Sequence, residues 1–329
     1  MSNRRKFLMV LGVGVLAAPL RTFAQQLTPR MHRIGFLGPS SAAGIASRLE
    51  AFRAGLRDLG YVEGKNLVIE FRWAEGKYDR LSELAEELVR LNVELIVTSS
   101  TPGVLAAKQA TTVIPIVMAA QGDAIVTGIV TSLARPGGNI TGSNFFSPQL
   151  QAKRLELLKE VLPKVRRFGF LVNPATAPMP REVFKVMSVT AKSLTVEVQT
   201  FEVGGPQEIE SVFAEMAKRR VAAFTGQDEP MLTANAALVA SIAARHRIAA
   251  IGSSAFAEVG GLMGYGPDFS VLWRRAAYFV DRIFKGAKPG DIPIEQPTKF
   301  ELTVNMKTAK ALGVKIPNTI LVRADKVIE

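Results

Sequence analysis

Short apolar segments alternate with longer amphipathic segments along nearly the whole chain, and this alternation limits the fold more than any other feature. Apolar runs at 34–37, 67–73, 94–97 and 114–119 are typical of buried strands. The first intervening segment repeats apolar residues at helical spacings of three and four, at Ile45, Leu49, Phe52, Leu56 and Leu59. Strands separated by helices form a parallel sheet that is covered on both faces.

The same cycle starts again after the turn at Gly137, Gly138 and Asn139. Strands are predicted at 168–172, 196–203, 222–225 and 248–251, and helices at about 179–193, 207–219 and 230–245. The sequence therefore predicts an α/β fold with two doubly wound parallel-sheet lobes.

The remaining chain is too short for a third domain, so its elements must complete the two lobes. They are a short strand before Gly266, a helix containing Leu272 and Phe279, and a strand at 300–305. We expect three crossings between the lobes, near 141–146, 262–266 and 300–304, which together make a three-segment hinge. The predicted lobes comprise residues 31–142 with 266–301, and 143–265 with 302–329.

The first 25 residues have the order of an export signal. Arg4, Arg5 and Lys6 precede an apolar run from Phe7, and small residues follow, with cleavage expected after Ala24. The run falls short of the roughly 20 residues that span a bilayer, although an uncleaved anchor is the alternative. The arginine pair also fits a twin-arginine signal, so both that route and the general secretory route stay open.

Cysteine is absent from the chain, which excludes disulfides, thiolate metal sites and an acylated lipoprotein cysteine. An exported protein without a lipid anchor is useful where an outer membrane retains it. We therefore expect the mature chain in the periplasm, with no membrane-spanning segment after signal removal.

The formal net charge of +12 raises the possibility of nucleic-acid binding. The basic residues, however, stand beside acidic ones in stretches such as RLSELAEELVR and KRLELLKEVLPKVRR, which are typical of solvated helix faces. No basic arm is evident. We predict no nucleic-acid partner.

Groups suited to catalysis are scarce. The chain has two histidines, His32 and His246, at positions that do not suggest a triad or a metal site. No GxGxxG follows a strand, and no Walker-type phosphate loop occurs. We predict a protein that is not an enzyme and that needs neither a cofactor nor a metal.

Ligands of open α/β sheets bind beyond the carboxyl ends of the strands. Loops in those places, at 38–44, 98–103, 119–123, 173–178, 226–230 and 252–256, are rich in hydroxyl and amide groups. The hydrogen-bonding residues that we expect at the ligand are Ser40, Ser41, Gln121, Asn144, Asn173, Gln227 and Ser253.

Ser99, Ser100 and Thr101 precede a helix that Pro102 is expected to open. Free backbone N–H groups and hydroxyls at a helix start can hold a carboxylate. Capping of the helix by the same side chains would produce the same pattern, so both interpretations stay open.

Carboxylates and rings complete the candidate site. The candidates to meet an amine or hydroxyl of the ligand are Asp123, Asp228, Glu229 and Asp268, and each could instead cap a helix or lie exposed. Phe145 and Tyr265 lie at predicted crossings, where a ring either walls the cleft or packs in the hinge.

Longer phrases of the chain, among them LARPGGNITG, YGPDF and QPTKFELTVN, resemble the ABC-transporter substrate-binding family that includes tryptophan-binding proteins. The resemblance covers nearly the whole mature chain. It implies a periplasmic-binding fold of type I, a small solute and an inner-membrane permease with its ATPase as partner. In related receptors, the pocket that Ser99, Ser100 and Thr101 match holds an amino-acid carboxylate.

The resemblance leaves the solute open between an amino acid and an aromatic or other organic carboxylate. A ligand-sensing receptor for a membrane sensor is the second interpretation, and a periplasmic α/β enzyme is the third. We expect a monomer, with a dimer as the alternative.

Overall fold

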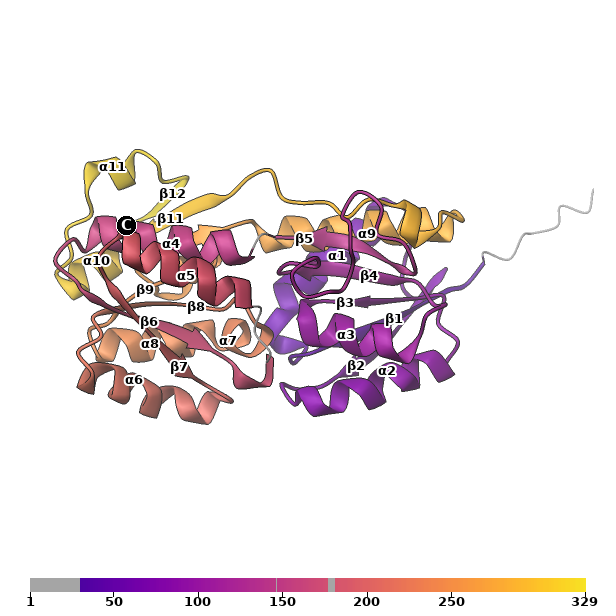
Figure 1. The fold of residues 1–329 in the computed structure, drawn as a ribbon. Helices are drawn as coiled ribbons and strands as arrows, with labels where there is room; N and C mark the ends of the chain where they lie inside the picture. The colour runs from indigo at the N-terminus through magenta and orange to yellow at the C-terminus, as the bar shows by residue number, and fades with distance from the viewer. Residues whose placement is uncertain (1–29, 146, 177–180) are drawn as a thin grey trace, which may run out of the picture. The chain divides into compact units, whose positions relative to one another are not determined.

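The computed structural model describes residues 30–145, 147–176 and 181–329 (Figure 1). The predicted export signal at residues 1–25 lies outside them. Of the helices within these ranges, none combines the length and the apolar character that a membrane span needs.

The first lobe is built on a five-stranded sheet in which all strands are parallel. The strand order is β2 (Leu67–Trp73), β1 (His32–Gly38), β3 (Leu95–Thr98), β4 (Ile116–Gln121) and β5 (Ile140–Asn144). Strands β3, β4 and β5 are buried along their whole length, as expected for a sheet with helices on both faces.

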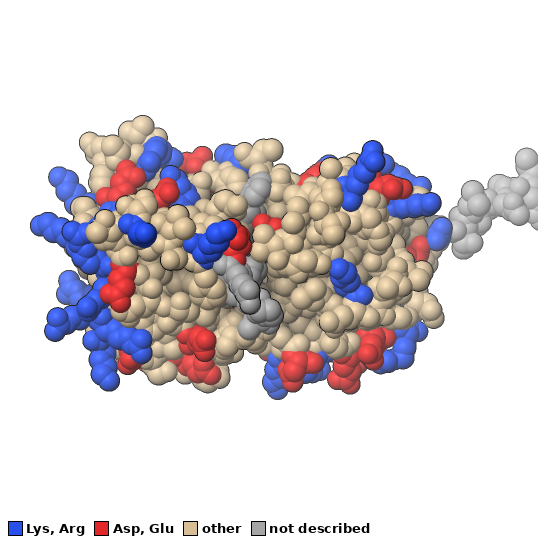
Figure 2. All heavy atoms as spheres, in the orientation of Figure 1, with Lys and Arg blue, Asp and Glu red and all other residues tan. Residues whose placement is uncertain are grey.

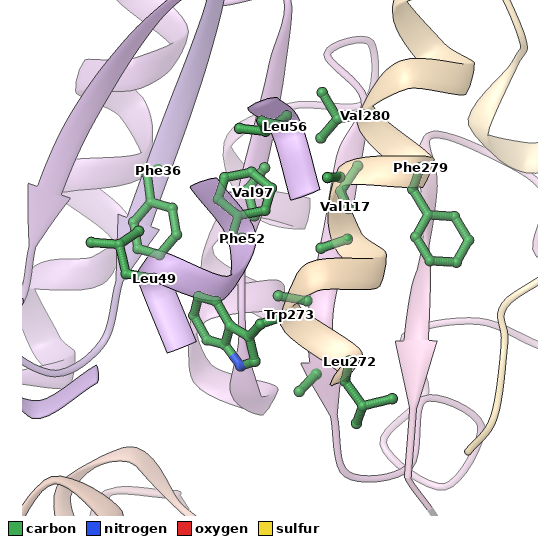
Figure 3. Close-up of a cluster of buried hydrophobic side chains, with 14 of the residues drawn as sticks. Phe36, Leu49, Phe52, Leu56, Val97, Val117, Leu272, Trp273, Phe279 and Val280 are labelled. Atoms are coloured by element: carbon green, nitrogen blue, oxygen red, sulfur yellow. The ribbon is translucent and has the colours of Figure 1, made fainter. Parts of the chain in front are cut away.

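Two pairs of helices cover this sheet. Helices α1 (Ala46–Asp58) and α9 (Phe269–Phe284) pack on one face, where Phe52 and Trp273 are almost fully buried against Phe36 (Figure 3). Helices α2 (Leu81–Arg90) and α3 (Ser100–Ala110) pack on the other face against Leu37 and Ile96. The apolar stripe read from Ile45 to Leu56 is the buried side of α1.

The second lobe is built on a seven-stranded sheet. Its order is β12 (Lys326–Ile328), β11 (Glu301–Asn305), β10 (Met263–Gly266), β9 (Ala249–Gly252), β8 (Ala223–Gly226), β6 (Arg167–Val172) and β7 (Glu197–Glu202). Strands β10 and β11 pair antiparallel, whereas the other pairs are parallel. Between these two strands the chain crosses to the first lobe and forms α9 there. It then returns to the second lobe, so that β11 runs in the direction opposite to β10.

Helices again cover both faces of this sheet. One core contains residues of α4 (Ser147–Val161), α5 (Arg181–Ser193), α10 (Met306–Leu312) and α11 (Asn318–Leu321). The other contains residues of α6 (Ile209–Lys218), α7 (Pro230–Ala234) and α8 (Ala236–Arg245).

The chain passes between the lobes three times, after β5, after β10 and before β11. The predicted fold class, two doubly wound lobes joined by a three-segment hinge, is therefore confirmed. The residue-level lobe boundaries at 142/143, 265/266 and 301/302 remain a prediction.

Two helices differ from their predicted limits. Helix α3 begins at Ser100 rather than at Pro102, so that Ser100 and Thr101 lie in its first turn. The single helix predicted over 230–245 is two helices, separated at Asn235. The side-chain amide of Asn235 donates to the carbonyl of Met231 at 2.8 Å, and local bonds of this kind compete with helix continuation.

The connections that lead into β6, β7, β8 and β9 form a basic edge of the second lobe (left in Figure 2). Counted from the last two residues of each helix to the first residue of the next strand, they contain nine Lys or Arg and two Glu. The three corresponding connections of the first lobe contain three basic and three acidic residues. At this edge the basic residues outnumber the acidic ones, because helix C-termini favour cations.

Candidate ligand-binding cleft

A cleft with an empty volume of about 1010 Å³, part of it open to solvent, is lined by residues of both lobes. The first lobe contributes the segments after β1, β3 and β4, and the second lobe contributes the segments after β6 and β8. These are carboxyl ends of parallel strands, the places from which the sequence predicts ligand contacts.

The start of α3 forms a hydroxyl-rich part of the cleft, lined by Ser99, Ser100 and Thr101. Ser99 occupies the N-cap position in an extended conformation, but its side chain makes no capping hydrogen bond. Ser100 adopts a left-handed backbone with φ of 63°, and its buried Oγ has no hydrogen-bond partner within the described part of the chain. Side-chain capping therefore does not account for the hydroxyls of Ser99 and Ser100.

Arg48 of α1 lines the same cleft. Its guanidinium carbon lies 4.7 Å from the centroid of the Phe269 ring, a cation–π distance. Neither a hydrogen bond nor an ion pair joins Arg48 to another residue in the described ranges. Burial lowers the pKa of Arg48, and the charges of Asp228 and Asp268 oppose that shift in part.

Asp228, a predicted ligand contact, is paired with Arg154 of α4 in the second lobe. Nη1 and Nη2 of Arg154 donate to the two carboxylate oxygens at 2.8 and 3.1 Å, and Nε donates to the carbonyl of Tyr265 at 2.8 Å. Arg154 has no exposed side-chain surface, and 7% of the Asp228 side chain is exposed. Asp228 therefore faces the cleft as one half of a buried ion pair.

Glu229 joins the two lobes. Tyr78 of the first lobe donates its hydroxyl to Glu229 Oε2 at 2.7 Å, and Asn173 of the second lobe donates to the same oxygen at 3.2 Å. The carboxylate also caps α7 by accepting from the backbone N–H groups of Met231 and Leu232. Burial raises the pKa of Glu229 despite these four donors, and burial together with the nearby Glu229 carboxylate also raises the pKa of Tyr78.

This shift makes the stability of the protein depend on pH. A raised pKa in the folded state means that protonation of Glu229 favours folding, so its stabilising contribution is complete below the ordinary carboxyl pKa and is lost as pH rises through the folded pKa. We expect the free energy of unfolding of the native chain, relative to Glu229→Gln, to fall in urea titrations as pH rises above the ordinary carboxyl pKa of about 4.3. Parallel pH profiles for the two proteins would contradict the assignment.

Several other predicted site residues also line the cleft. Ser40, Asp123, Phe145 and Gln227 do so, and Ser253 lines a smaller adjoining cavity that shares Gln227 and Asp228 with it. Asp123 Oδ1 accepts the N–H groups of Ile125 and Val126, both at 3.1 Å. Phe145 is 5% exposed and packs edge-to-face on Phe269. Phe145 therefore belongs to the hydrophobic core of the first lobe and also lines the cleft.

The remaining predicted residues lie outside the cleft lining and bond to the protein itself. Ser41 Oγ accepts the N–H of Gly44, Asn144 Oδ1 accepts that of Ala124, and Gln121 donates to Thr101. Asp268 caps α9 through the N–H of Ser270, and the Tyr265 ring stacks on Phe300 in the hinge. The side-chain amide of Asn173 donates to Glu229 Oε2. These residues position the lining loops and hinge rather than facing the cleft.

Helical residues that the sequence interpretation missed complete the lining. Gln151 of α4 and Trp273 of α9 are fully or almost fully buried, and Gln151 Nε2 and Trp273 Nε1 have no partner among the described residues. Gln151 Oε1 accepts the hydroxyl of Thr225 at 3.1 Å, which orients the amide. In the sequence, these residues are indistinguishable from the buried stripe of a helix.

Within residues 30–145, 147–176 and 181–329, no three His, Cys, Asp or Glu side chains are grouped so that they could hold a metal ion.

Comparison with known proteins gives consistent similarities. The sequence model of the family described as ABC transporter substrate binding protein matches residues 34–328. A tyrosine-binding protein of Clostridioides difficile (strain R20291) is 28% identical over 268 residues, which are 81% of this chain and 76% of that protein.

Two solved structures share the fold over most of the chain. An ABC domain from Streptococcus pneumonia in complex with L-Trp is 28% identical with a TM-score of 0.82, covering 91% of this chain and 100% of that one. A conserved domain protein from Vibrio cholerae is 25% identical with a TM-score of 0.81, covering 91% and 99%. Because the family model spans almost all described residues, the chain belongs to the ABC transporter substrate-binding protein family.

Proposed function

We propose that this protein is the periplasmic solute-binding component of an ABC importer and that it traps a small organic solute in the cleft. The observation that carries the proposal is the cleft itself, which residues of both lobes line at the carboxyl ends of their strands. A solute that contacts both lobes favours their closed arrangement by the difference between its free energies of interaction with the closed and open forms.

The residues around the cleft support a role in binding rather than catalysis. Hydroxyls at the start of α3 and the Arg48 guanidinium suit an anionic group, and the Phe145 and Phe269 rings suit an apolar body. The relatives named for tyrosine and complexed with L-Trp support a small solute of amino-acid size. The closed form would then be what a permease and its ATPase recognise.

The test is a thermal-shift screen of the mature chain against amino acids, aromatic acids and other small carboxylates. A solute that binds only the folded state at about 100 times its Kd contributes about 2.7 kcal/mol, which raises the melting temperature by several degrees. We expect one chemical class to give such a shift and the double variant Ser99→Ala, Ser100→Ala to lose it.

Ser193→Ala, at the exposed end of α5, is the matched control and should keep the shift. A solute that is recovered chemically changed would favour an enzyme instead. A shift that survives in the double variant would place the solute elsewhere.

A further inference from the structure

Four hydrogen-bond donors on residues that line the cleft have no hydrogen-bond partner among the described residues. They are the guanidinium of Arg48, Ser100 Oγ, Gln151 Nε2 and Trp273 Nε1. The last three atoms are buried without a partner in the described part of the chain. Buried polar atoms in native proteins are nearly always bonded, so these four groups call for a partner that the chain does not supply. Only the Ser100 hydroxyl can accept as well as donate.

The acceptors of the cleft, in contrast, already receive hydrogen bonds from the protein. Arg154 donates to both oxygens of Asp228, and four donors surround Glu229. Gln227 Oε1 accepts the N–H of Asn173 at 3.0 Å. Asp123 accepts two N–H groups on Oδ1, and no described residue donates to its Oδ2.

From this asymmetry we propose that the solute is a small carboxylate that carries no ammonium group, an inference that rests on the proposed solute-binding function. A carboxylate only accepts hydrogen bonds and has about four lone-pair positions, which matches donors on Arg48, Ser100, Gln151 and Trp273. An ammonium group would require several free acceptors, but both oxygens of Asp228 and of Glu229 already accept hydrogen bonds from the protein, and among the lining carboxylates Asp123 Oδ2 alone accepts none from the described residues. The Phe145 and Phe269 rings leave room for an aryl or alkyl body.

Matched pairs of solutes that differ in one group test the proposal directly. Isothermal titration should compare 3-phenylpropionate with L-phenylalanine, and indole-3-propionate with L-tryptophan. We expect the acid of at least one pair to bind at least tenfold more tightly than its amino acid. Amino acids that bind as tightly as their matched acids, or more tightly, would overturn the proposal.

These outcomes are distinct from failure of the proposed function. If a solute of any class binds in the cleft, the solute-binding role stands even when the carboxylate proposal falls. If none of a broad library binds, the solute-binding role itself is contradicted, and the carboxylate proposal falls with it.

Gln151→Glu is the sharpest variant. It keeps an acceptor for the Thr225 hydroxyl and replaces the unpaired amide donor by a carboxylate oxygen. We expect the affinity for the acid to fall about a hundredfold, because the new carboxylate oxygen at position 151 and the carboxylate of the solute are both hydrogen-bond acceptors and meet in a desolvated site. Gln199→Glu on β7, outside the cleft lining, changes the net charge equally and should leave affinity unchanged.

Two further variants guard against a folding artefact. Trp273→Phe removes the indole N–H while keeping an aromatic ring. It should lower the affinity for the acid about tenfold, while the unfolding transition of the variant stays as in the native chain. Asp123→Asn should tighten the acid a few-fold, because a negative charge that lines the cleft is removed. Weaker binding of the acid in Asp123→Asn, or unchanged binding in Gln151→Glu, would show that the donors named above do not hold the solute.

Discussion

Arg154→Met should lower the free energy of unfolding by about 3–5 kcal/mol, because it leaves a buried carboxylate without its counter-charge. Arg154 has no exposed side-chain surface and holds both oxygens of Asp228 together with the carbonyl of Tyr265. Urea denaturation followed by circular dichroism measures the loss. The loss should fall on the second lobe, since all three groups belong to it.

A second substitution separates the ion pair from simple packing. Adding Asp228→Asn to Arg154→Met removes the stranded charge and should restore at least about 2 kcal/mol. Arg167→Met, which breaks an exposed pair with Glu197 on the same sheet, should cost less than about 1 kcal/mol. Strictly additive losses in the double variant would show that Arg154 acts through packing alone.

Arg48→Met should weaken binding of the solute by about 3 kcal/mol, roughly a hundredfold, with little effect on folding. The substitution keeps the apolar stem against Phe269 and removes the one charged group of the cleft that has no partner among the described residues. Stability should hardly change, because burial already disfavours the charge on Arg48 in the empty cleft.

The matched control lies on the same helix. Arg57→Met removes an exposed arginine of α1 that pairs with Glu50, and it should leave affinity as in the native chain. Titration calorimetry of both variants measures the difference. Equal affinities for Arg48→Met and Arg57→Met would mean that the anionic group of the solute lies away from Arg48.

Periodicity was sufficient to predict most of the fold. The strand predicted at 168–172 matches β6 to within a residue, because a parallel sheet covered on both faces needs continuous apolar strands. The strand predicted at 67–73 matches β2, a half-buried strand at the edge of its sheet. The crossings could be placed because α9 and β11 follow the second lobe and have no room for a third core. The antiparallel pairing of β10 and β11 depends on the chain's return from the first lobe, which local patterns do not record.

The start of α3 shows why local signals misplace a helix end. Pro102 was expected at the first helical position, yet it is the third residue of the helix. The first turn uses none of its N–H groups within the helix, so proline is tolerated throughout that turn. The shift places the Ser100 hydroxyl in the turn itself.

The site was predicted less completely than the fold, because half of its chemistry comes from helices. The sequence pattern around Arg154 is that of a solvated helix face. In the structure Arg154 is fully buried and pairs with Asp228, which lies on a loop far from it in the sequence. Arg48 and Trp273 likewise reach the cleft from α1 and α9. Which face of a helix lines a cleft depends on how two lobes meet, and no periodicity encodes that.

The fluorescence of Trp273, which lines the cleft, tests most directly whether the solute binds there. The chain has two tryptophans, so Trp73→Phe leaves Trp273 as the only reporter. Titration with the best solute of the screen should give a saturable change at one solute per chain, and Arg48→Met should abolish it at the same concentrations. Binding seen by calorimetry without any change in the fluorescence of Trp273 would contradict a solute site in this cleft.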